Sequence, residues 1–465
     1  RLGNGRQGVH ILGASDNMVG GLVAGQGNTI ANNNVNGILV TSGYRNVLHG
    51  NAIDGNTLLA IDLSNDGVTG NDVGDGDNGA NDLQNFPVLD RATAGPSTTG
   101  IVGSLSSAAS TTYTLEFFAS SSCDTSGYGE AETVVWSTTV STDASGDADF
   151  ELVAPTTVTS GWYLTSTATD PTGNTSELSA CREILPIPSV AIGDRTVTET
   201  DSGSNTTASF TVSLSGPSAL TAQVAWATAD GTAVAGLDYS SASGTVSFAP
   251  GETTKTVEVT ILGDDMDEFD ETYTVGLSTP VDCTIADATG AGLILDQDDP
   301  PTFAVDDQTV TETDGGSTAT ATFTVTLSAA SGKPIGMDWA TADGTAAAGA
   351  DYTAGMGSLS FSPGETTKTI DVTVTGDDID EFDETYTVDL SGETNVTPAD
   401  ASGLGTITDD DETPTVAIDD QTVTEGHSGT TVDATYTVSV SAPSGKTITV
   451  DWATADGTAT APDDY

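Results

Sequence analysis

An acidic run of eleven residues occurs twice, 113 residues apart, and constrains the fold more than any other part of the sequence. Gly263–Tyr273 reads GDDMDEFDETY, and Gly376–Tyr386 reads GDDIDEFDETY. The six carboxylates in each run repel one another and weaken a compact state unless something neutralises them. Because Ca²⁺ prefers six to eight oxygen ligands, the two runs predict calcium sites beside β-strands.

The same 113-residue step extends well beyond the acidic runs. It relates three further sets of residues: Trp226, Trp339 and Trp452; Glu199, Glu312 and Glu425; and Tyr239, Tyr352 and Tyr465. A period this long makes each repeating unit a whole domain. Apolar residues at every second position, as in Phe210, Val212 and Leu214, place one strand face in a core and the other in water. We therefore expect an all-β protein of tandem two-sheet sandwiches.

Charge composition excludes some classes of partner. Asp and Glu number 68 against 10 Lys and Arg, which gives a formal net charge of -58. Such a surface repels phosphate backbones and anionic lipids, so we expect neither nucleic-acid binding nor membrane-surface binding. The sequence also has no apolar run of about 18 residues that could span a membrane. Cation binding and solvation in a salty medium both remain open.

Residues 1–65 read as coils of a solenoid. Short strand pieces at residues 8–11, 37–40 and 60–63 are separated by Asn-rich turns at residues 28–33 and 46–51. Asn tolerates left-handed backbone conformations, and stacked Asn side chains can form ladders between coils. This part resembles the last two or three coils of a right-handed parallel β-helix, as found in many secreted bacterial proteins. Asp16, Asp54 and Asp62 are expected to serve in turns and caps.

Residues 66–85 form a stretch rich in Gly, Asn and Asp. It contains GxGxxG at Gly74, Gly76 and Gly79, but no strand–helix unit surrounds it, so it does not predict dinucleotide binding. A solvated linker is the favoured interpretation. A calcium loop is the alternative, because Asp72, Asp75, Asp77 and Asp82 are closely spaced oxygen donors.

Residues 86–186 read as an immunoglobulin-like sandwich that serves as a spacer, since alternating strands are separated by turn clusters. Cys123 and Cys181 could pair within it, which would indicate an oxidising compartment, or could both remain thiols. Cys283 stands where the next repeat has Val396, and we expect it to be buried. The chain opens at Arg1 without a visible signal peptide, which suggests an internal fragment of a larger protein.

Several motifs together resemble the Calx-beta domain, the calcium-binding module of sodium/calcium exchangers and of many cell-surface proteins. They are TVTE, WATADGTA, GxDY, the PGET turn, the acidic run and a terminal DxD or DDD, and they recur in this order from about Pro188 to Tyr465. The resemblance implies seven-stranded immunoglobulin-like sandwiches with Ca²⁺ ions clustered at one tip. The predicted modules are residues 187–300 (module 1), 301–413 (module 2) and 414–465 (module 3), the last incomplete and not expected to fold well alone.

The resemblance also implies calcium ligands in modules 1 and 2, with Ca²⁺ as the bound ion. In module 1 they are Glu199, Asp238, Asp264, Asp265, Glu268, Glu271, Asp296, Asp298 and the carbonyl of Met266. In module 2 they are Glu312, Asp351, Asp377, Asp378, Glu381, Glu384, Asp409, Asp410, Asp411 and the carbonyl of Ile379. The family's loop opens with a further Asp where Gly263 and Gly376 stand here, and Gln297 interrupts the terminal acids of module 1, so fewer or weaker ions are expected.

Three functions are compatible with the sequence. The first is a non-enzymatic, extracellular or cell-surface protein whose Calx-beta array is stiffened by Ca²⁺ and acts as a stalk or adhesion module, with a surface glycan or another cell-surface protein as its partner. The second is the accessory C-terminal region of a carbohydrate-active β-helix enzyme whose catalytic part lies upstream. In the third, the acids form a halophile's solvation layer. The acids beside turns, as against strand-face acids such as Glu258 and Asp371, favour specific ion binding.

Overall fold

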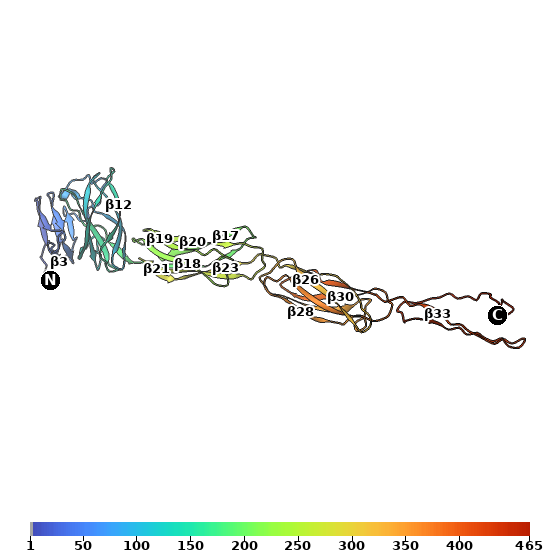
Figure 1. The fold of residues 1–465 in the computed structure, drawn as a ribbon. Coiled ribbons are helices and arrows are strands. Elements are labelled where there is room, and N and C mark those ends of the chain that lie inside the picture. The colour runs from blue at the N-terminus through green and yellow to red at the C-terminus, as the bar shows by residue number, and fades with distance from the viewer. Residues whose placement is uncertain (1–2) are drawn as a thin grey trace. The chain divides into compact units, whose positions relative to one another are not determined.

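The computed structural model describes residues 3–465, which form β-strands and one short 3₁₀ helix, η1 (Ala80–Leu83). Figure 1 shows the strands gathered into successive groups along the chain. None of the helical structure in the described residues is long and apolar enough to cross a membrane. This all-β architecture agrees with the prediction.

The N-terminal stack (residues 3–65) consists of three short parallel sheets. β1 pairs with β4 and β4 with β7, while β2 pairs with β5 and β3 with β6. Asn side chains form the expected ladder between successive layers: the Nδ2 of Asn33 donates to Oδ1 of Asn56 at 2.7 Å, and Asn28 pairs likewise with Asn51 at 3.0 Å. The strands are β1 (Val9–Ile11), β2 (Met18–Gly20), β3 (Thr29–Ala31), β4 (Ile38–Val40), β5 (Val47–His49), β6 (Ala52–Asp54) and β7 (Ile61–Leu63).

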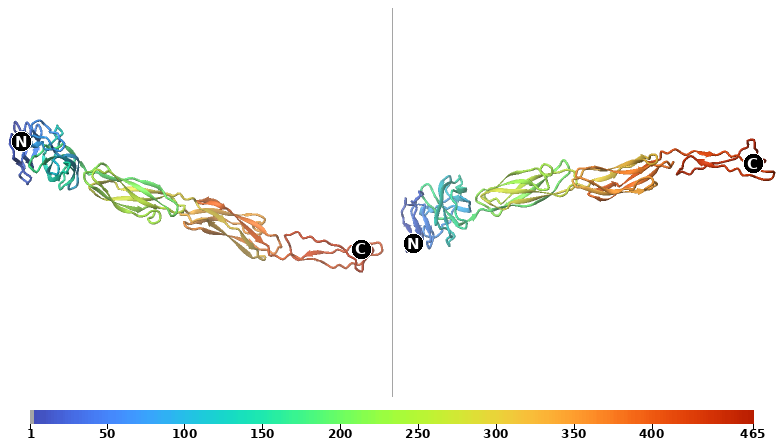
Figure 2. Two further views of the ribbon diagram at one scale, coloured as in Figure 1. Left: turned by 90° about the horizontal axis from the view of Figure 1, so that it is seen from above. Right: turned by 60° about the horizontal axis from the view of Figure 1, so that its bottom comes forward.

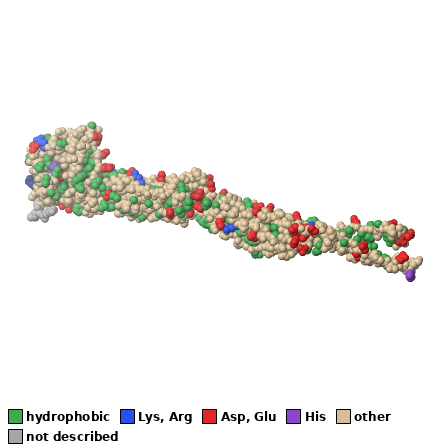
Figure 3. Space-filling view, in the orientation of Figure 1, with side chains coloured by type: hydrophobic (Ala, Val, Ile, Leu, Met, Phe, Trp, Pro, Cys, Tyr) green, Lys and Arg blue, Asp and Glu red, His purple; other side chains and the backbone are tan. Residues whose placement is uncertain are grey.

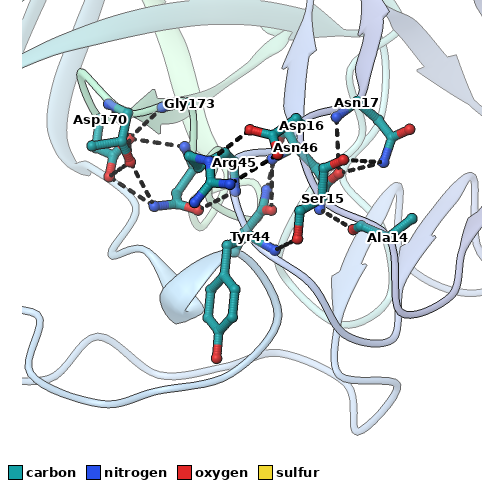
Figure 4. Close-up of polar contacts among 12 residues, drawn as sticks. Ala14, Ser15, Asp16, Asn17, Tyr44, Arg45, Asn46, Asp170 and Gly173 are labelled. Atoms are coloured by element: carbon teal, nitrogen blue, oxygen red, sulfur yellow. Dashed lines mark hydrogen bonds and ion pairs between the residues drawn. The ribbon is translucent and has the colours of Figure 1, made fainter.

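The structure of the stack corrects the predicted turns and specifies the roles of Asp16 and Asp62. Residues 28–33 and 46–51 were predicted as turns, but each contains a strand, β3 and β5, because Ile30 and Leu48 point into the core between the Asn positions. Asp16 holds the Arg45 guanidinium at 2.6 Å, and this pairing keeps the pKa of Asp16 below its usual value (Figure 4). Asp62 accepts from Asn36 and from the Asn65 amide, a cap role as expected.

Residues 86–186 fold into a sandwich whose two sheets are joined through a shared strand. β14 pairs with β13 on one side and with β8 on the other, which gives the order β11-β10-β13-β14-β8-β9-β12. A disulfide joins Cys123 to Cys181, which settles the pairing that the sequence left open. The strands are β8 (Val88–Ala94), β9 (Thr99–Ser106), β10 (Thr112–Ser120), β11 (Thr133–Ser141), β12 (Asp147–Ala154), β13 (Tyr163–Thr169) and β14 (Arg182–Pro186).

This sandwich is more than a spacer, because it supplies hydrogen-bond acceptors to the edge of the N-terminal stack. Four backbone amides of the stack donate to side chains of the sandwich at 2.6 to 3.0 Å: Arg45 to Asn174 Oδ1, Leu48 to Thr175 Oγ1, Gly50 to Glu116 Oε1 and Leu63 to Glu177 Oε1. An exposed sheet edge presents unpaired amides that invite association with other chains. Figure 4 shows this seam near Arg45 and the Asp170–Gly173 loop. The sandwich therefore terminates the stack.

The prediction of a solvated linker at residues 66–85 is wrong in its second half. Asn81, Gln84 and Asn85 are buried, and Asn81 exchanges hydrogen bonds with the Asn46 backbone. The carboxylates of Asp72, Asp75 and Asp77 each bring an oxygen within 4.8 Å of the others, the arrangement that the alternative interpretation as a calcium loop requires. Asp75 also accepts from Ser107 Oγ, and its burial raises its pKa.

Buried Glu130 makes the seam sensitive to pH. Burial, followed by the negative charges of Asp54 and Asp124, raises its pKa from 4.5 to about 7, and its Oε2 has no hydrogen-bond partner. A raised folded-state pKa gives stability that is fully present below pH 4.5 and is lost as pH rises through about 7. We expect Glu130→Gln to be more stable than wild type at pH 8, by on the order of 3 kcal/mol, and to match it near pH 4.

Thermal unfolding from pH 4 to pH 8 checks this prediction. The exposed Glu151 provides the matched control, since Glu151→Gln removes the same charge from the surface of the same sandwich. Equal responses of the two variants to pH would contradict the role given to Glu130.

Modules 1 and 2 are two-sheet sandwiches with the same topology. Module 2 has the sheets β29-β26-β24-β31 and β25-β32-β30-β27-β28. Figure 2 shows this layering from two further directions. Its strands are β24 (Thr302–Val305), β25 (Gln308–Thr311), β26 (Thr318–Leu327), β27 (Ile335–Asp343), β28 (Met356–Phe361), β29 (Thr367–Thr375), β30 (Glu384–Thr394), β31 (Thr397–Asp400) and β32 (Ser402–Thr408).

In module 1 the sheets are β20-β17-β15-β22 and β16-β23-β21-β18-β19, and Cys283 is buried as predicted. The strands are β15 (Ser189–Ile192), β16 (Arg195–Thr198), β17 (Asn205–Leu214), β18 (Ala222–Asp230), β19 (Ser243–Phe248), β20 (Thr254–Leu262), β21 (Glu271–Val281), β22 (Thr284–Asp287) and β23 (Thr289–Leu295).

The first strand of each module divides between its two sheets, which is one reason that the strands exceed the seven expected. In module 2 the division falls at Asp306 and Asp307. Asp306 Oδ1 accepts the Thr324 amide at 2.6 Å, and Asp307 Oδ1 accepts the Leu404 amide at 2.8 Å. Side-chain acceptors of this kind satisfy amides that the interrupted ladder would leave unpaired. The division lets β25 pair in parallel with β32, which positions the site described below.

Residues 414–465 form a single pair of strands, β33 (Val416–Ile418) with β34 (Val438–Val440). Trp452, whose equivalents in modules 1 and 2 pack against the cores, is 82% exposed here. As expected from the sequence, this segment builds no core of its own.

Candidate metal centre

Two groups of three carboxylates lie in module 2, and the fold accounts for the first. Glu312 directly follows β25, and Asp409 and Asp411 follow β32. Because β25 and β32 are parallel neighbours, their carboxyl ends meet at one edge of the sheet. Each of the three residues offers an oxygen within 4.8 Å of the other two.

Asp351, Glu381 and Glu384 form the second group, also with oxygens within 4.8 Å of one another. Asp351 lies between β27 and β28, where its Oδ2 accepts the Ala347 amide at 2.6 Å. Glu381 lies in the loop before β30, and Glu384 is the first residue of that strand. The acidic run therefore contributes to this second group, while strand ends supply the first.

The electrostatics of module 2 show how poorly these acids tolerate one another without a cation. Burial, then Asp377 and Asp409, raises the pKa of Glu312 to about 7. Burial and a hydrogen bond with Asp351 raise the pKa of Glu384 to about 7. Bringing a divalent cation to these carboxylates would offset both burial and mutual repulsion.

The donor set fits Ca²⁺. Every side chain in the two groups offers carboxylate oxygen, which suits a hard cation and not a thiolate- or imidazole-selecting metal. Asp411 Oδ2 is buried without a hydrogen-bond partner, as is Oγ1 of Thr313, the residue that follows Glu312 in the sequence. A buried polar atom left without a partner costs about 1–3 kcal/mol, so a cation bound to Asp411 would remove one such cost.

Module 1 repeats the first group with Glu199, Asp296 and Asp298. Burial, followed by Asp264 and Asp296, raises the pKa of Glu199 to about 8. Asp298 Oδ2 lacks a partner, as does Asp411 Oδ2 at the equivalent position of module 2. Gln297, the departure noted in the sequence, donates to Asp201 at 2.7 Å. The residues at the sequence positions of the second group are Asp238, Glu268 and Glu271.

Some predicted ligands organise the loops. Asp264 and Asp377 accept the amides of Met266 and Ile379 at 2.8 Å. Asp265 accepts the Ser202 amide at 2.9 Å, and Asp378 accepts the Gly315 amide at 3.0 Å. These bonds tie the acidic run to the loop after the first strand. Carbonyl ligation by Met266 and Ile379, and ligation by Asp410, stay predictions.

The structure explains why the two acidic runs open with glycine. A Cβ atom at Gly263 would lie 1.8 Å from the Thr200 carbonyl oxygen, and one at Gly376 would lie 1.6 Å from that of Thr313. Both distances are far shorter than a van der Waals contact distance. The Asp that opens this loop in Calx-beta domains therefore has no room at either position. Each site is therefore built without that carboxylate.

Sequence reasoning missed two acids and two lysines at the tips. Asp267 and Asp380 are 2% and 3% exposed, and they receive Lys333 and Lys446, respectively. Each lysine also contacts a predicted ligand, Asp296 for Lys333 and Asp409 for Lys446. The available signal was the position of the two lysines, which keep the 113-residue step in a chain of only 10 basic residues.

Comparison with known proteins identifies the family to which these modules are similar. The Calx-beta domain profile matches residues 190–292, 296–422 and 409–465. Sodium/calcium exchanger 2 of Rattus norvegicus is 30% identical over 187 residues, which are 36% of this chain and 20% of the exchanger. Sodium/calcium exchanger 1 of Canis lupus familiaris is 32% identical over 183 residues, 35% of this chain and 19% of the exchanger. The chain thus spans about a fifth of these relatives.

Solved structures of Calx domains are also similar to part of this chain. The crystal structure of CBD12 from CALX1.2 is 21% identical, with a TM-score of 0.23, and the match covers 47% of this chain and 99% of that one. The apo form of the Calx CBD1 domain is 26% identical, with a TM-score of 0.22, over 24% of this chain and 99% of that one. Calx-beta domains are calcium-binding, regulatory modules. Since the profile covers more than half of its residues, this chain belongs to the Calx-beta domain family.

Proposed function

We propose that this chain is a non-enzymatic, calcium-binding part of an extracellular or cell-surface protein. Modules 1 and 2 bind Ca²⁺ at their carboxylate groups, and the ion stiffens the array as a stalk or adhesion module. The observation that carries the proposal is the repeated group at Glu312, Asp409 and Asp411, equivalent to Glu199, Asp296 and Asp298. In both modules one carboxylate oxygen of the group is buried without a partner.

Two further observations support the location and the mechanical role. The disulfide between Cys123 and Cys181 is typical of an oxidising compartment. The terminal acids directly precede the connections Pro300–Pro301 and Glu412–Pro414, so a bound ion would restrict the chain where one module leads to the next. Figure 3 shows Asp and Glu side chains along the visible face of the modules, with few basic ones. A surface glycan or a cell-surface protein is the proposed partner class.

The N-terminal stack favours a second candidate. Its parallel strand pairs and Asn ladders support assignment to a parallel β-helix, a fold that often binds or cleaves polysaccharide. On this alternative, the chain is the accessory region of a carbohydrate-active enzyme. Polysaccharide cleavage by the intact protein would favour it over the stalk.

Calorimetric titration of the whole chain with CaCl₂, in high monovalent salt, tests calcium binding. We expect saturable binding, because the groups combine hard oxygen ligands with excess negative charge. Glu312→Gln with Asp411→Asn should remove only the ion bound by Glu312, Asp409 and Asp411. Glu199→Gln with Asp298→Asn should remove only the ion bound by Glu199, Asp296 and Asp298. Mg²⁺ should compete poorly, since it demands a tighter octahedral shell.

The control is Asp371→Asn, which removes an exposed carboxylate from β29 without touching either group. If the paired variants bind as many ions as wild type, the acids serve solvation, the third interpretation of the sequence.

A further inference from the structure

A short turn follows β17 in module 1, β26 in module 2 and β34 in module 3, and it contacts the preceding part of the chain. The turns are Ser218-Ala219-Leu220 after β17, Ser331-Gly332-Lys333 after β26 and Ser444-Gly445-Lys446 after β34, again at the 113-residue step. Figure 1 marks β17, β26 and β33, which locate the three modules. The serine is common to all three, whereas the two residues after it differ between the first turn and the others.

The turns share one internal structure. The backbone amide two residues after each serine donates to that serine's Oγ, at 2.9 Å for Leu220, 3.0 Å for Lys333 and 3.1 Å for Lys446. In modules 1 and 2 the serine carbonyl also accepts the amide of the PGE turn, from Gly251 and Gly364. The difference between Ala-Leu and Gly-Lys therefore does not serve the turn itself.

The Gly-Lys turns contact the acidic tip that precedes them. Lys333 Nζ lies 2.6 Å from Asp267 Oδ1 and 3.2 Å from Asp296 Oδ2, and 5.5 Å from the centre of the Phe269 ring. Ser331 Oγ and the Gly332 amide donate to the Asp267 carbonyl, each at 3.0 Å. The tip loops 198–204 and 263–270 accordingly group with residues 295–465 in one compact unit.

The second junction reproduces this contact set with different residues. Lys446 Nζ lies 2.5 Å from Asp380 Oδ1, 3.1 Å from Asp409 Oδ2 and 5.4 Å from the centre of the Phe382 ring. Ser444 Oγ and the Gly445 amide donate to the Asp380 carbonyl, at 3.0 and 3.1 Å.

Glycine is favoured at the middle of these turns because a glutamate side chain lies close to it. A Cβ on Gly332 would lie 2.5 Å from Glu268 Oε1 and 2.7 Å from its Cγ. A Cβ on Gly445 would lie 2.7 Å from Glu381 Oε1 and 2.9 Å from its Cγ. A tip with this glutamate therefore admits a glycine turn far more readily than an alanine turn.

The Ala-Leu turn of module 1 contacts a different kind of surface. Leu220 is 3% exposed and lies over Gly95 and Gly100 of sandwich 86–186, where a Cβ would meet it at 2.9 and 2.7 Å, respectively. The Ala219 amide donates to Thr93 Oγ1 at 2.8 Å. This surface offers glycines and a hydroxyl in place of carboxylates, and a buried lysine there would lack an ion partner.

We propose that the two residues after this serine determine which kind of domain can precede a module. Gly-Lys fits the acidic tip of another Calx-beta module with Asp at the positions of Asp267 and Asp296. Ala-Leu fits a sandwich surface that meets it with Gly95, Gly100 and the Thr93 hydroxyl, and so begins an array. The turns of modules 2 and 3 thus fit the tip of a preceding Calx-beta module, and the turn of module 1 fits sandwich 86–186.

Amide hydrogen exchange in the whole chain tests the proposal. The Gly332 amide reports the junction, because it donates to Asp267, and the Gly364 amide reports the fold of module 2, because it donates to Ser331. We expect Gly332→Ala with Lys333→Leu to speed exchange at residue 332 by about tenfold or more, since the variant loses the charged hydrogen bond from Lys333 to the Asp267 carboxylate, and such bonds contribute at least that factor. Exchange at Gly364 should stay slow.

The reciprocal change, Ala219→Gly with Leu220→Lys, should speed exchange at residue 219 and leave Gly251 slow. Lys333→Arg should keep Gly332 protected, and Lys368→Leu, a change at a half-buried lysine that pairs with Glu365 of its own module, should alter neither amide. Loss of protection at Gly364 as well would mean that the double variant disturbs the fold of module 2. Lys333→Met is then used instead, because it retains Gly332 and most of the side-chain volume. Slow exchange at residue 332 in both the double variant and Lys333→Met would overturn the proposal.

Discussion

Saturating Ca²⁺ is expected to stabilise module 2 by about 4 kcal/mol once its concentration reaches a thousand times Kd, because the ion binds the folded state only. The stabilisation arises at Glu312, Asp409 and Asp411, where a cation would offset the burial and the neighbouring carboxylates that raise the pKa of Glu312. This stabilisation is measured by unfolding the whole chain with heat or urea and following hydrogen exchange in the peptides that cover residues 301–413.

The matched variant makes this prediction sharp, because its effect should change sign with calcium. Glu312→Gln with Asp411→Asn removes two repelling charges, so in a chelator the variant should be more stable than wild type. In saturating Ca²⁺ it should be less stable, since it has lost ligands. Asp371→Asn, on an exposed strand face, should follow wild type in both conditions. A variant that is less stable than wild type even in chelator would contradict the assignment of these acids to a cation site.

Truncating Phe323 is expected to have a similarly large effect on module 2, through the core. Phe323 is fully buried and meets the Tyr386 ring edge-on, with centroids 6.1 Å apart. Tyr386 in turn stacks on Tyr352 at 4.5 Å. Phe323→Ala should therefore cost about 3–5 kcal/mol of unfolding free energy in module 2, measured by urea unfolding with hydrogen exchange of residues 301–413.

The loss should also reach the metal centre. Tyr386 lies two residues beyond Glu384 on β30, so loosening its packing should weaken calcium binding by module 2 as well. Met356→Ala is the control: Met356 is 84% exposed on β28, and its truncation should change stability by less than about 0.5 kcal/mol. Equal losses in the two variants would mean that Phe323 is not a central core residue.

The alternation of apolar residues was sufficient to predict the strands and much of the candidate site. It places Phe323 and Val325 in the core of module 2, and the structure confirms both. The acids beside the turns gather in groups because the strands that they follow are neighbours, as Glu312 and Asp409 show. Local pattern and repeat spacing carry this information directly.

Contacts between distant segments could not be read from such patterns. Asp267 stands within the acidic run like its neighbours, and only the fold reveals that it is buried against Lys333. Asn81 sits in a stretch typical of a solvated linker, yet it is buried beside Asn46, 35 residues away. The hydrogen bond that Glu177 accepts from the Leu63 amide likewise joins residues 114 apart in the sequence.

Anomalous X-ray scattering from crystals grown with CaCl₂ tests calcium binding most directly, because it locates the ions. We predict anomalous peaks about 2.3–2.6 Å from carboxylate oxygens of Glu312, Asp409 and Asp411, and at the equivalent residues of module 1. Crystals of the Glu312→Gln and Asp411→Asn double variant should lack the peak in module 2 and keep the one in module 1. Calcium absent from both groups, or bound only at strand-face acids such as Asp371, would contradict the assignment of these carboxylates to calcium sites.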